Sequence, residues 1–412
     1  MYLSFIDFVF FFYMFLGLYM STLLIMIYLQ NREKLNYYPE GRLEPVSIVV
    51  PCYNAEKNIG KTIESLLNLD YPKEMIEIIV VDDKSKDNSV EVARGYAKKY
   101  KNVRVIVNKR NSGGAAEPTN LGIKAAKYNY IAVADDDSSP DRDAIKKMIG
   151  FLQEDDKVGG VTCAVLVRNP RNFIQKLQSI EYSIIAWSRK LLDFIDSVYV
   201  TPGPFALYKK KVLLEIGLFD TKNLTQDIEI IWRMMAHGYK ARMCMATRVH
   251  SEAPSKFKAW FRQRIRWNIG GNQTIWKYKS LFLRRGMLGY FVLPFFALSL
   301  FLGLFGLGLF GYLMTKGLIV HYLSAKYSLY AQSALFHMQD ISFSPSILNF
   351  FGAALFFIGL FFTFFGINSV NLEKGQKSNL FNVLFYSLIY LTLYPLTLVA
   401  SSYRMMRGKY TW

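Results

Sequence analysis

The sequence predicts an α/β protein whose doubly wound, mostly parallel sheet is joined to a transmembrane helical region. From Val46 onward, short runs of β-branched residues alternate with stretches of helical periodicity, as in a parallel sheet covered by helices. Four other stretches, each long enough to cross a bilayer, contain no Asp, Glu, Lys or Arg. With 412 residues, 52% of them hydrophobic, the chain has room for a soluble domain and several spans.

The soluble part is predicted to contain four strands separated by three helices. The β-branched runs at residues 46–51, 76–83, 103–108 and 130–137 are predicted strands, and residues 56–67, 88–99 and 115–127 are predicted helices. Asn54 and Asp87 are candidate N-caps of the first two helices. In doubly wound sheets ligands bind beyond the carboxyl ends of the strands, so the chemistry is expected there.

Polar side chains gather at those strand ends, and their types indicate the ligand. No G-x-G-x-x-G follows the first strand and no G-x-x-x-x-G-K-[ST] occurs, which disfavours dinucleotide and P-loop sites. Asp135 and Asp137 are one residue apart on an extended strand end, so both can bind one Mg²⁺ or Mn²⁺ while Asp136 points elsewhere. A run of aspartates taken alone is more often a solvated turn, but four polar strand ends at one edge favour a binding site.

The uncharged stretches are predicted transmembrane helices, at residues 8–29, 286–315, 347–372 and 378–403. The first is longer than the apolar run of a signal peptide and no small-residue cleavage site follows it, so a retained anchor is expected. Residues 317–336 are partly apolar but centre on Lys326, whose insertion would cost roughly 2.5–3.5 kcal/mol. They are expected to form a loop or an interfacial helix.

The charges around the first span predict the orientation of the chain. Arg32 and Lys34 follow this span and only Asp7 precedes it, which places the N-terminus outside and the middle segment in the cytosol. Three later spans would then place the basic tail around Lys409 outside, against the positive-inside tendency. Either the tail is an exception, giving four spans, or residues 317–336 also insert, giving five.

Overall charge and cysteine content narrow the function further. The formal net charge of +18 suits nucleic acid, an anionic membrane face or a polyanionic substrate, and the apolar spans favour a membrane protein with no nucleic-acid partner. Cys52, Cys163 and Cys244 show no paired spacing, so reduced, buried thiols are expected rather than disulfides or a zinc site.

Four motifs follow one another along the soluble segment. They are P-C-Y-N-A-E-K-N-I-G-K-T-I-E-S-L-L from residue 51, V-V-D-D-K-S-K-D-N-S from residue 80, A-D-D-D-S from residue 134, and Q-R-I-R-W at residues 263–267. In this order and spacing they resemble the inverting family-2 glycosyltransferases, especially the membrane-bound branch of cellulose, chitin, hyaluronan and poly-N-acetylglucosamine synthases. The resemblance implies a GT-A type fold. The expected domains are a transmembrane helix at 1–30, a cytosolic GT-A domain with interfacial helices at 31–286, and about three spans at 287–412.

The resemblance implies a role for each matching residue. Donor-binding residues would be Tyr53, Glu56 and Asp83 at the base and ribose, Asp135 with Asp137 at the metal, and Gln263, Arg264 and Arg266 at the diphosphate. Gly203, in the acceptor-side loop, and Trp267 would contact the acceptor. In L-T-Q-D-I-E, which resembles the family's T-E-D, Asp227 is the expected general base. A sugar hydroxyl is a poor nucleophile, so a carboxylate must take its proton as it attacks the anomeric carbon.

Two departures from the family pattern are visible in the sequence. Gln226 stands where the family has Glu, which alters the support around the base. Gly113 and Gly114 are followed by alanine where several synthases have a Gly-Lys pair, so one positive contact to the donor phosphates is missing.

Two amphipathic stretches are expected to lie at the membrane surface. One covers residues 174–195 and the other contains W-F-R-Q-R-I-R-W at residues 260–267. Either could instead be an ordinary packed surface helix.

The leading hypothesis is an inverting transfer from a nucleotide-diphospho-sugar, such as a UDP-sugar, to a growing β-linked polysaccharide. The catalytic domain would lie in the cytosol of a multi-pass membrane protein. A single transfer to a membrane lipid is the alternative, and a non-catalytic membrane scaffold ranks below both. About three spans after the domain are few for one chain to enclose a polymer, so a homo-oligomer or a partner subunit is considered.

Overall fold

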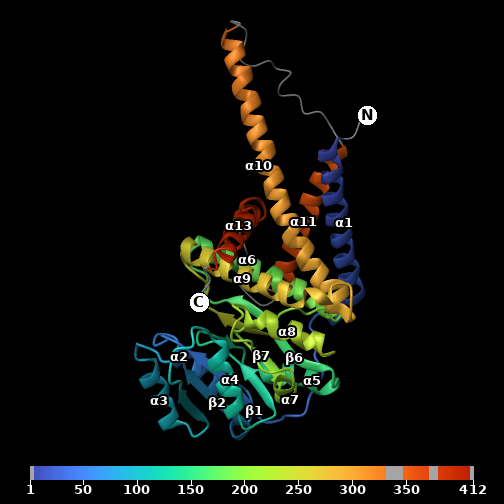
Figure 1. Cartoon of the computed structure of the whole chain (residues 1–412). Helices are drawn as coiled ribbons and strands as arrows, with labels where there is room; N and C mark the ends of the chain where they lie inside the picture. Colours follow the sequence, from blue (N-terminus) through green and yellow to red (C-terminus); the bar gives the residue numbers. More distant parts are fainter. Residues whose placement is uncertain (1–3, 331–346, 371–378, 409–412) are drawn as a thin grey trace.

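An eight-stranded sheet forms the lower part of the chain in Figure 1, and long helices rise from one end of it. The computed structural model describes residues 4–330, 347–370 and 379–408. The strands are β1 Val46–Cys52, β2 Ile76–Asp82, β3 Val103–Val107, β4 Tyr130–Val133, β5 Ser139–Pro140, β6 Val158–Val167, β7 Ala206–Lys209 and β8 Lys240–Ser251. The helices of the domain are α2 Ile59–Leu67, α3 Ser89–Lys99, α4 Ala116–Ala125, α5 Ala144–Glu154, α6 Phe173–Asp193, α7 Lys210–Glu215, α8 Gln226–Ala236 and α9 Phe257–Tyr278.

The sheet has the order β3-β2-β1-β4-β7-β6-β8-β5. The four predicted strands, β1 to β4, pair in parallel, which confirms the doubly wound half-domain. β7 then runs antiparallel between β4 and β6, and the short β5 is antiparallel to β8, so the complete sheet is mixed. The parallel half brings the carboxyl ends of β1, β2 and β4 to one edge.

Alternating side chains of the central strands fill two cores, one on each face of the sheet. Ile48 and Val50 of β1 pack against α2, α3 and α5 on one face. Val49, between them, packs on the other face with α4, α6 and α8. Because successive residues of a strand point to opposite faces, this burial fixes the register of β1 and hence the position of its carboxyl end.

The predicted N-cap of the first helix, Asn54, is wrong, whereas the second, Asp87, does accept a hydrogen bond from the Ser89 amide at 3.1 Å at the start of α3. The residues that precede α2 and α3 are Asn58 and Asn88, and neither makes a side-chain cap. Asn54 instead has a left-handed φ of 52°, and its side-chain oxygen accepts a hydrogen bond from the Lys86 amide at 2.8 Å. It therefore joins the loops after β1 and β2.

Three of the remaining helices are long and apolar enough to cross a membrane: α1 Phe5–Asn31, the π-helical turn η4 Leu288–Val292 with α10 Leu293–Tyr330, and α11 Ile347–Val370. A fourth candidate is a pair bent by 41°, formed by α12 Leu380–Phe385 with the π-helical turn η6 Tyr386–Tyr390 and by α13 Leu393–Met406. The described residues thus contain three such helices, or four if the bent pair counts as one span.

The expectation of a loop or a separate interfacial helix at residues 317–336 is wrong for its described part. Residues 317–330 continue α10 without a break, while 331–336 lie outside the described residues. With η4, this helix has 43 residues, which is about 65 Å at the rise of an α-helix and far exceeds the roughly 30 Å of a hydrocarbon core. Because the helix is longer than the apolar layer, Lys326 can lie beyond that layer, where it would carry no insertion cost.

Helices α6 and α9 lie between the sheet and the long helices (Figure 1). They are the two predicted amphipathic stretches. α6 packs on β6 and β8 on one side and on α11 on the other, while α9 contacts α8 and α13. This position lets each helix present one face to the domain and another to the spanning region.

Candidate functional site

A cavity of about 730 Å³ lies beyond the carboxyl ends of β1 and β4, and α6, α8 and α9 contribute to its walls. The predicted site residues that line it are Tyr53, Asp83, Asp135, Asp137, Gly203, Asp227, Gln263, Arg266 and Trp267. Glu56 and Arg264 are the two predicted site residues that do not line it. Segments separated by more than two hundred positions in the sequence thus meet around one space.

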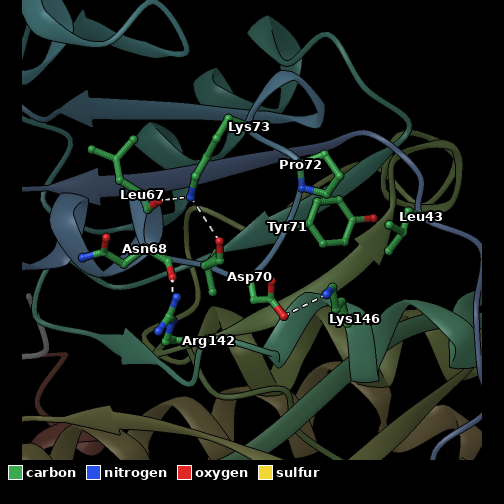
Figure 2. A pocket seen from close by; sticks show the side chains of 10 residues that line it. Leu43, Leu67, Asn68, Asp70, Tyr71, Pro72, Lys73, Arg142 and Lys146 are labelled. Atoms are coloured by element: carbon green, nitrogen blue, oxygen red, sulfur yellow. Dashed lines mark hydrogen bonds and ion pairs between the residues drawn. The ribbon is translucent and has the colours of Figure 1, made fainter.

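A second hollow, of about 550 Å³, lies at the end of α2 and is rich in cations (Figure 2). Lys73 donates hydrogen bonds to the main-chain carbonyl groups of Leu67, the last residue of α2, and of Leu69, while Arg142 donates to that of Asn68. Lys146 forms an ion pair with Asp70 at 2.8 Å. These cations already have partners, and they cap carbonyls that a helix end leaves unsatisfied. We therefore assign this hollow a structural role.

The end of the large cavity near β2 is shaped by Asp83. One carboxylate oxygen accepts hydrogen bonds from the Ser112 amide and hydroxyl, both at 2.8 Å, and the other accepts from Asn108 at 2.8 Å. Asp83 thereby holds the loop that carries Gly113 at the cavity wall.

Tyr53 lies at the same end with its side chain 45% exposed. Glu56 does not reach the cavity, because its carboxylate accepts a hydrogen bond from the Asn88 amide at 3.1 Å in front of α3. The geometry assigns Glu56 to joining two loops rather than to contacting a ligand.

Three consecutive aspartates follow β4 and all line the cavity. Asp137 accepts a hydrogen bond from the Ser251 hydroxyl at 3.1 Å. Asp136 accepts one from the Tyr53 amide at 3.3 Å, so it faces the loop after β1. Asp135 has the backbone of Gly203 against it: a Cβ at position 203 would lie 2.7 Å from both carboxylate oxygens. Only glycine at 203 lets the two segments approach this closely.

These carboxylates repel one another in a buried place. Burial, with the neighbouring Asp137 and Asp136 next in effect, raises the pKa of Asp135 well above its usual value. Burial and Asp137 likewise raise the pKa of Asp136 to about 7. A divalent cation relieves such repulsion and favours the ionised carboxylates.

The residues present fit a Mg²⁺ or Mn²⁺ ion that takes its other ligands from elsewhere. Among the described residues no group of three or more His, Cys, Asp or Glu side chains is arranged to hold a metal. A pair of carboxylates is nevertheless sufficient for Mg²⁺, which usually binds one or two protein carboxylates and completes its shell with water and substrate phosphates.

Asp227 lies in the first turn of α8, facing the same cavity. Thr225, and not Asp227, occupies the N-cap position. Burial raises the pKa of Asp227, while the nearby Arg266 opposes that shift. Arg266 also favours the ionised form of Asp135, so this one cation acts on both the predicted base and a predicted metal ligand.

Helix α9 carries Q-R-I-R-W, and the helical period decides which of its residues reach the cavity. Gln263, Arg266 and Trp267 are three and four positions apart, which places them on one face, and all three line the cavity. Arg264 is on another face, so its predicted contact with the donor is not supported. It is 1% exposed and forms an ion pair with Glu181 at 2.5 Å.

The contribution of α6 to the cavity wall was not predicted from the sequence. Tyr182, Ile185, Ala186 and Arg189 line the cavity and share one helical face. The signal in the sequence for this part of the wall was Arg189, a charged residue three and four positions from apolar residues. In an amphipathic helix this pattern does not say which face a long cationic side chain belongs to.

Comparisons with known proteins agree with this geometry. The family described as glycosyltransferase like family 2 matches residues 44–270. A poly-β-1,6-N-acetyl-D-glucosamine synthase of Staphylococcus aureus is 31% identical over 66% of this chain and 67% of its own length. The Staphylococcus epidermidis protein of the same name is 28% identical over 88% of this chain and 83% of its own.

One solved structure supports the fold over nearly the whole chain. It is a mannosyltransferase from Pyrobaculum calidifontis in complex with GDP-Man and Mn²⁺, which aligns with a TM-score of 0.54 at 16% identity and covers 94% of this chain and 96% of that one. The similarity includes the helical region as well as the sheet.

Proposed function

The chain belongs to glycosyltransferase family 2, and from this premise we propose that it is a membrane-bound synthase that extends a β-linked polysaccharide from UDP-N-acetylglucosamine. The relatives' names support both the sugar and the polymer. The observation that carries the proposal is the convergence of Asp135, Asp227 and the Gln263–Trp267 motif on one cavity. In this arrangement a metal-binding pair, a base and donors to the diphosphate can act on a single bond.

We propose that Asp227 is the general base. It would take the proton of an acceptor hydroxyl while the oxygen attacks the anomeric carbon of the donor. The bond from that carbon to the diphosphate breaks on the opposite face, so UDP leaves and the configuration inverts. Arg266, beside both Asp227 and Asp135, is suited to hold the diphosphate by paired N–H donors, with Gln263 next to it.

The donor would extend from the loop held by Asp83, past Asp135 and Asp137, towards Asp227. Asp135 and Asp137 would hold Mg²⁺ or Mn²⁺, which supplies positive charge for the departing diphosphate. Trp267 offers an apolar ring face to the acceptor sugar, and Gly203 leaves room beside Asp135.

A second candidate function is a single sugar transfer to a membrane lipid. The small number of helices that could span a membrane, three or four in the described residues, favours it, because they enclose little space for a polymer. A homo-oligomer or a partner subunit would remove this objection.

The test uses the purified full chain in detergent with Mg²⁺ or Mn²⁺ and a panel of UDP-sugars, followed by sizing of the products. We expect a ladder of long products from UDP-N-acetylglucosamine only, and none from the Asp227→Asn variant. A single lipid-soluble adduct would favour the second candidate. Absence of transfer from every donor above the level of the variant would contradict the proposed function.

A further inference from the structure

Two side chains in the cavity wall carry buried polar atoms that have no hydrogen-bond partner within the described residues. They are the Nε and Nη1 atoms of Arg189 and the side-chain oxygen of Gln226. Arg189 is only 4% exposed. Because buried polar groups are nearly always hydrogen-bonded in folded proteins, these atoms indicate a partner that comes from outside the chain.

Arg189 differs from Arg266 in the carboxylates on which it acts. Arg266 acts on both Asp135 and Asp227, whereas the groups that act most strongly on Arg189 are Tyr199 and Asp227. Among the described residues no carboxylate forms an ion pair with Arg189. Arg189 lines the same cavity as Asp227, where the proposed function places the attacking hydroxyl of the acceptor.

The two groups are complementary in hydrogen-bonding character. A guanidinium only donates, and the oxygen of Gln226 only accepts. A single ligand group that satisfies both side chains accepts and donates, as a sugar hydroxyl does through one oxygen and as an acetamido group does through its carbonyl and N–H. Gln226 directly precedes Asp227, so this group would sit beside the attacking hydroxyl.

We propose that Arg189 and Gln226 form an acceptor subsite, which binds a hydroxyl or acetamido group of the terminal sugar and places its neighbouring hydroxyl at Asp227. This inference rests on the proposed function and adds to it the residues that select the acceptor. The subsite is formed by α6 and α8, so the acceptor would lie between the sheet and the helices that border the spanning region.

The experiment measures transfer from UDP-N-acetylglucosamine to two soluble probes, a β-1,6-linked N-acetylglucosamine trisaccharide and the corresponding glucose trisaccharide. Arg189→Gln, Arg189→Lys and Gln226→Ala are compared with Lys176→Gln, an exposed site on the same helix. UDP binding to each variant reports on folding and on the donor site. We expect Arg189→Gln to raise the KM for the acceptor by about 10- to 100-fold, as for the loss of a hydrogen bond to a charged group. Arg189→Lys should retain part of the affinity.

The two probes distinguish the group that is bound. If the subsite holds the acetamido group, the variants lose the preference for the first probe, and if it holds a hydroxyl, both probes weaken equally. Unchanged acceptor KM in Arg189→Gln and Gln226→Ala, or a loss of UDP affinity with no acceptor effect, would overturn the inference. An inactive wild-type protein would instead contradict the proposed function.

Discussion

At the scale of single residues, the aspartates of the cavity need a nearby cation if they are to be ionised together. Asp135, Asp136 and Asp137 are crowded and buried, and their pKa values are raised chiefly by burial. Ionising them together costs free energy unless positive charge arrives. The metal and donor would therefore bind as a unit, because the diphosphate supplies the ligands that the protein lacks.

Replacing Asp137 by alanine should abolish transfer. The variant loses one of two carboxylates for the metal and should keep the fold, since the change lies in the loop after β4, where the Asp137 carboxylate accepts a hydrogen bond from Ser251 at 3.1 Å. Mn²⁺ binding in the presence of UDP, followed by electron paramagnetic resonance, should weaken in parallel. Asp70→Ala, at an exposed carboxylate of the second hollow, is the control and should behave as wild type. Full activity of Asp137→Ala in the presence of a chelator would show that no metal is needed at this site.

Replacing Asp227 by asparagine should slow transfer by about 10²–10⁴-fold with little change in UDP affinity. Asparagine keeps the shape of the side chain in the first turn of α8 but cannot take a proton. Since burial raises the pKa of Asp227 above 3.8, the wild-type rate should fall as the pH drops through that raised value. The variant should lack this acidic limb. Near-normal turnover would mean that Asp227 only supports the start of the helix.

At the scale of elements, Arg264 links the catalytic motif to the C-terminal helices. Its guanidinium pairs with Glu181 of α6, donates to the Tyr394 hydroxyl at 3.0 Å, and donates to the Gln263 oxygen at 2.7 Å. It also stacks on the Trp267 ring, 4.0 Å from the centroid. Arg264, which does not line the cavity, thus fixes the positions of Gln263 and Trp267, which do.

We expect the buried Glu181–Arg264 pair to be strongly coupled. Glu181→Met or Arg264→Met should each destabilise the protein by about 3–5 kcal/mol, because each leaves one buried charge unpaired. The double variant should be less destabilised than the sum of the two. Thermal unfolding in detergent measures this cycle, with the exposed Lys146–Asp70 pair, expected at about 0–1 kcal/mol, as control. Strict additivity at Glu181 and Arg264 would show that the pair is not coupled.

Sequence patterns predicted those features of the fold and the site that depend on residues close together in the sequence. The parallel strands β1 to β4 follow from β-branched runs, and the cavity position follows from the polar residues at their ends. The partner of Arg264 could not be predicted, because Glu181 lies 83 positions earlier and only tertiary packing joins them. Arg189 was missed for the same reason. The continuation of α10 to Tyr330 was not predicted, because Lys326 was expected to lie inside the bilayer if the helix continued.

At the scale of the whole molecule, the bent C-terminal pair packs alongside the helix that carries the catalytic motif. Three hydrogen bonds join α9 to this pair, from Trp260 to Tyr390 at 2.5 Å, from Arg264 to Tyr394 at 3.0 Å and from Asn268 to Thr397 at 2.9 Å. Residue numbers increase in the same direction on both sides of this contact, so η6 and α13 run beside α9 (Figure 1). With 14 residues, about 21 Å, α13 alone is too short to cross the roughly 30 Å hydrocarbon core.

This arrangement offers a solution to the conflict between span number and charge. If α9 lies at the cytosolic surface, α13 lies there too, and Arg404 and Arg407 remain in the cytosol in agreement with the positive-inside tendency. Only α1, α10 and α11 would then cross the membrane. Neither an exceptional tail nor a fifth span is needed.

The prediction is that a cysteine at Arg407 stays unlabelled in intact cells and reacts with an impermeant thiol reagent after permeabilisation. The three native cysteines are buried, so they should give little background. Ser4→Cys, before α1, should be labelled in intact cells, and Lys101→Cys, on the exposed surface of the catalytic domain, should behave like Arg407→Cys. Labelling of position 407 without permeabilisation would show that the bent pair crosses the membrane. We expect the catalytic domain in the cytosol because nucleotide-sugar donors are made there. Labelling of position 101 in intact cells would overturn this placement.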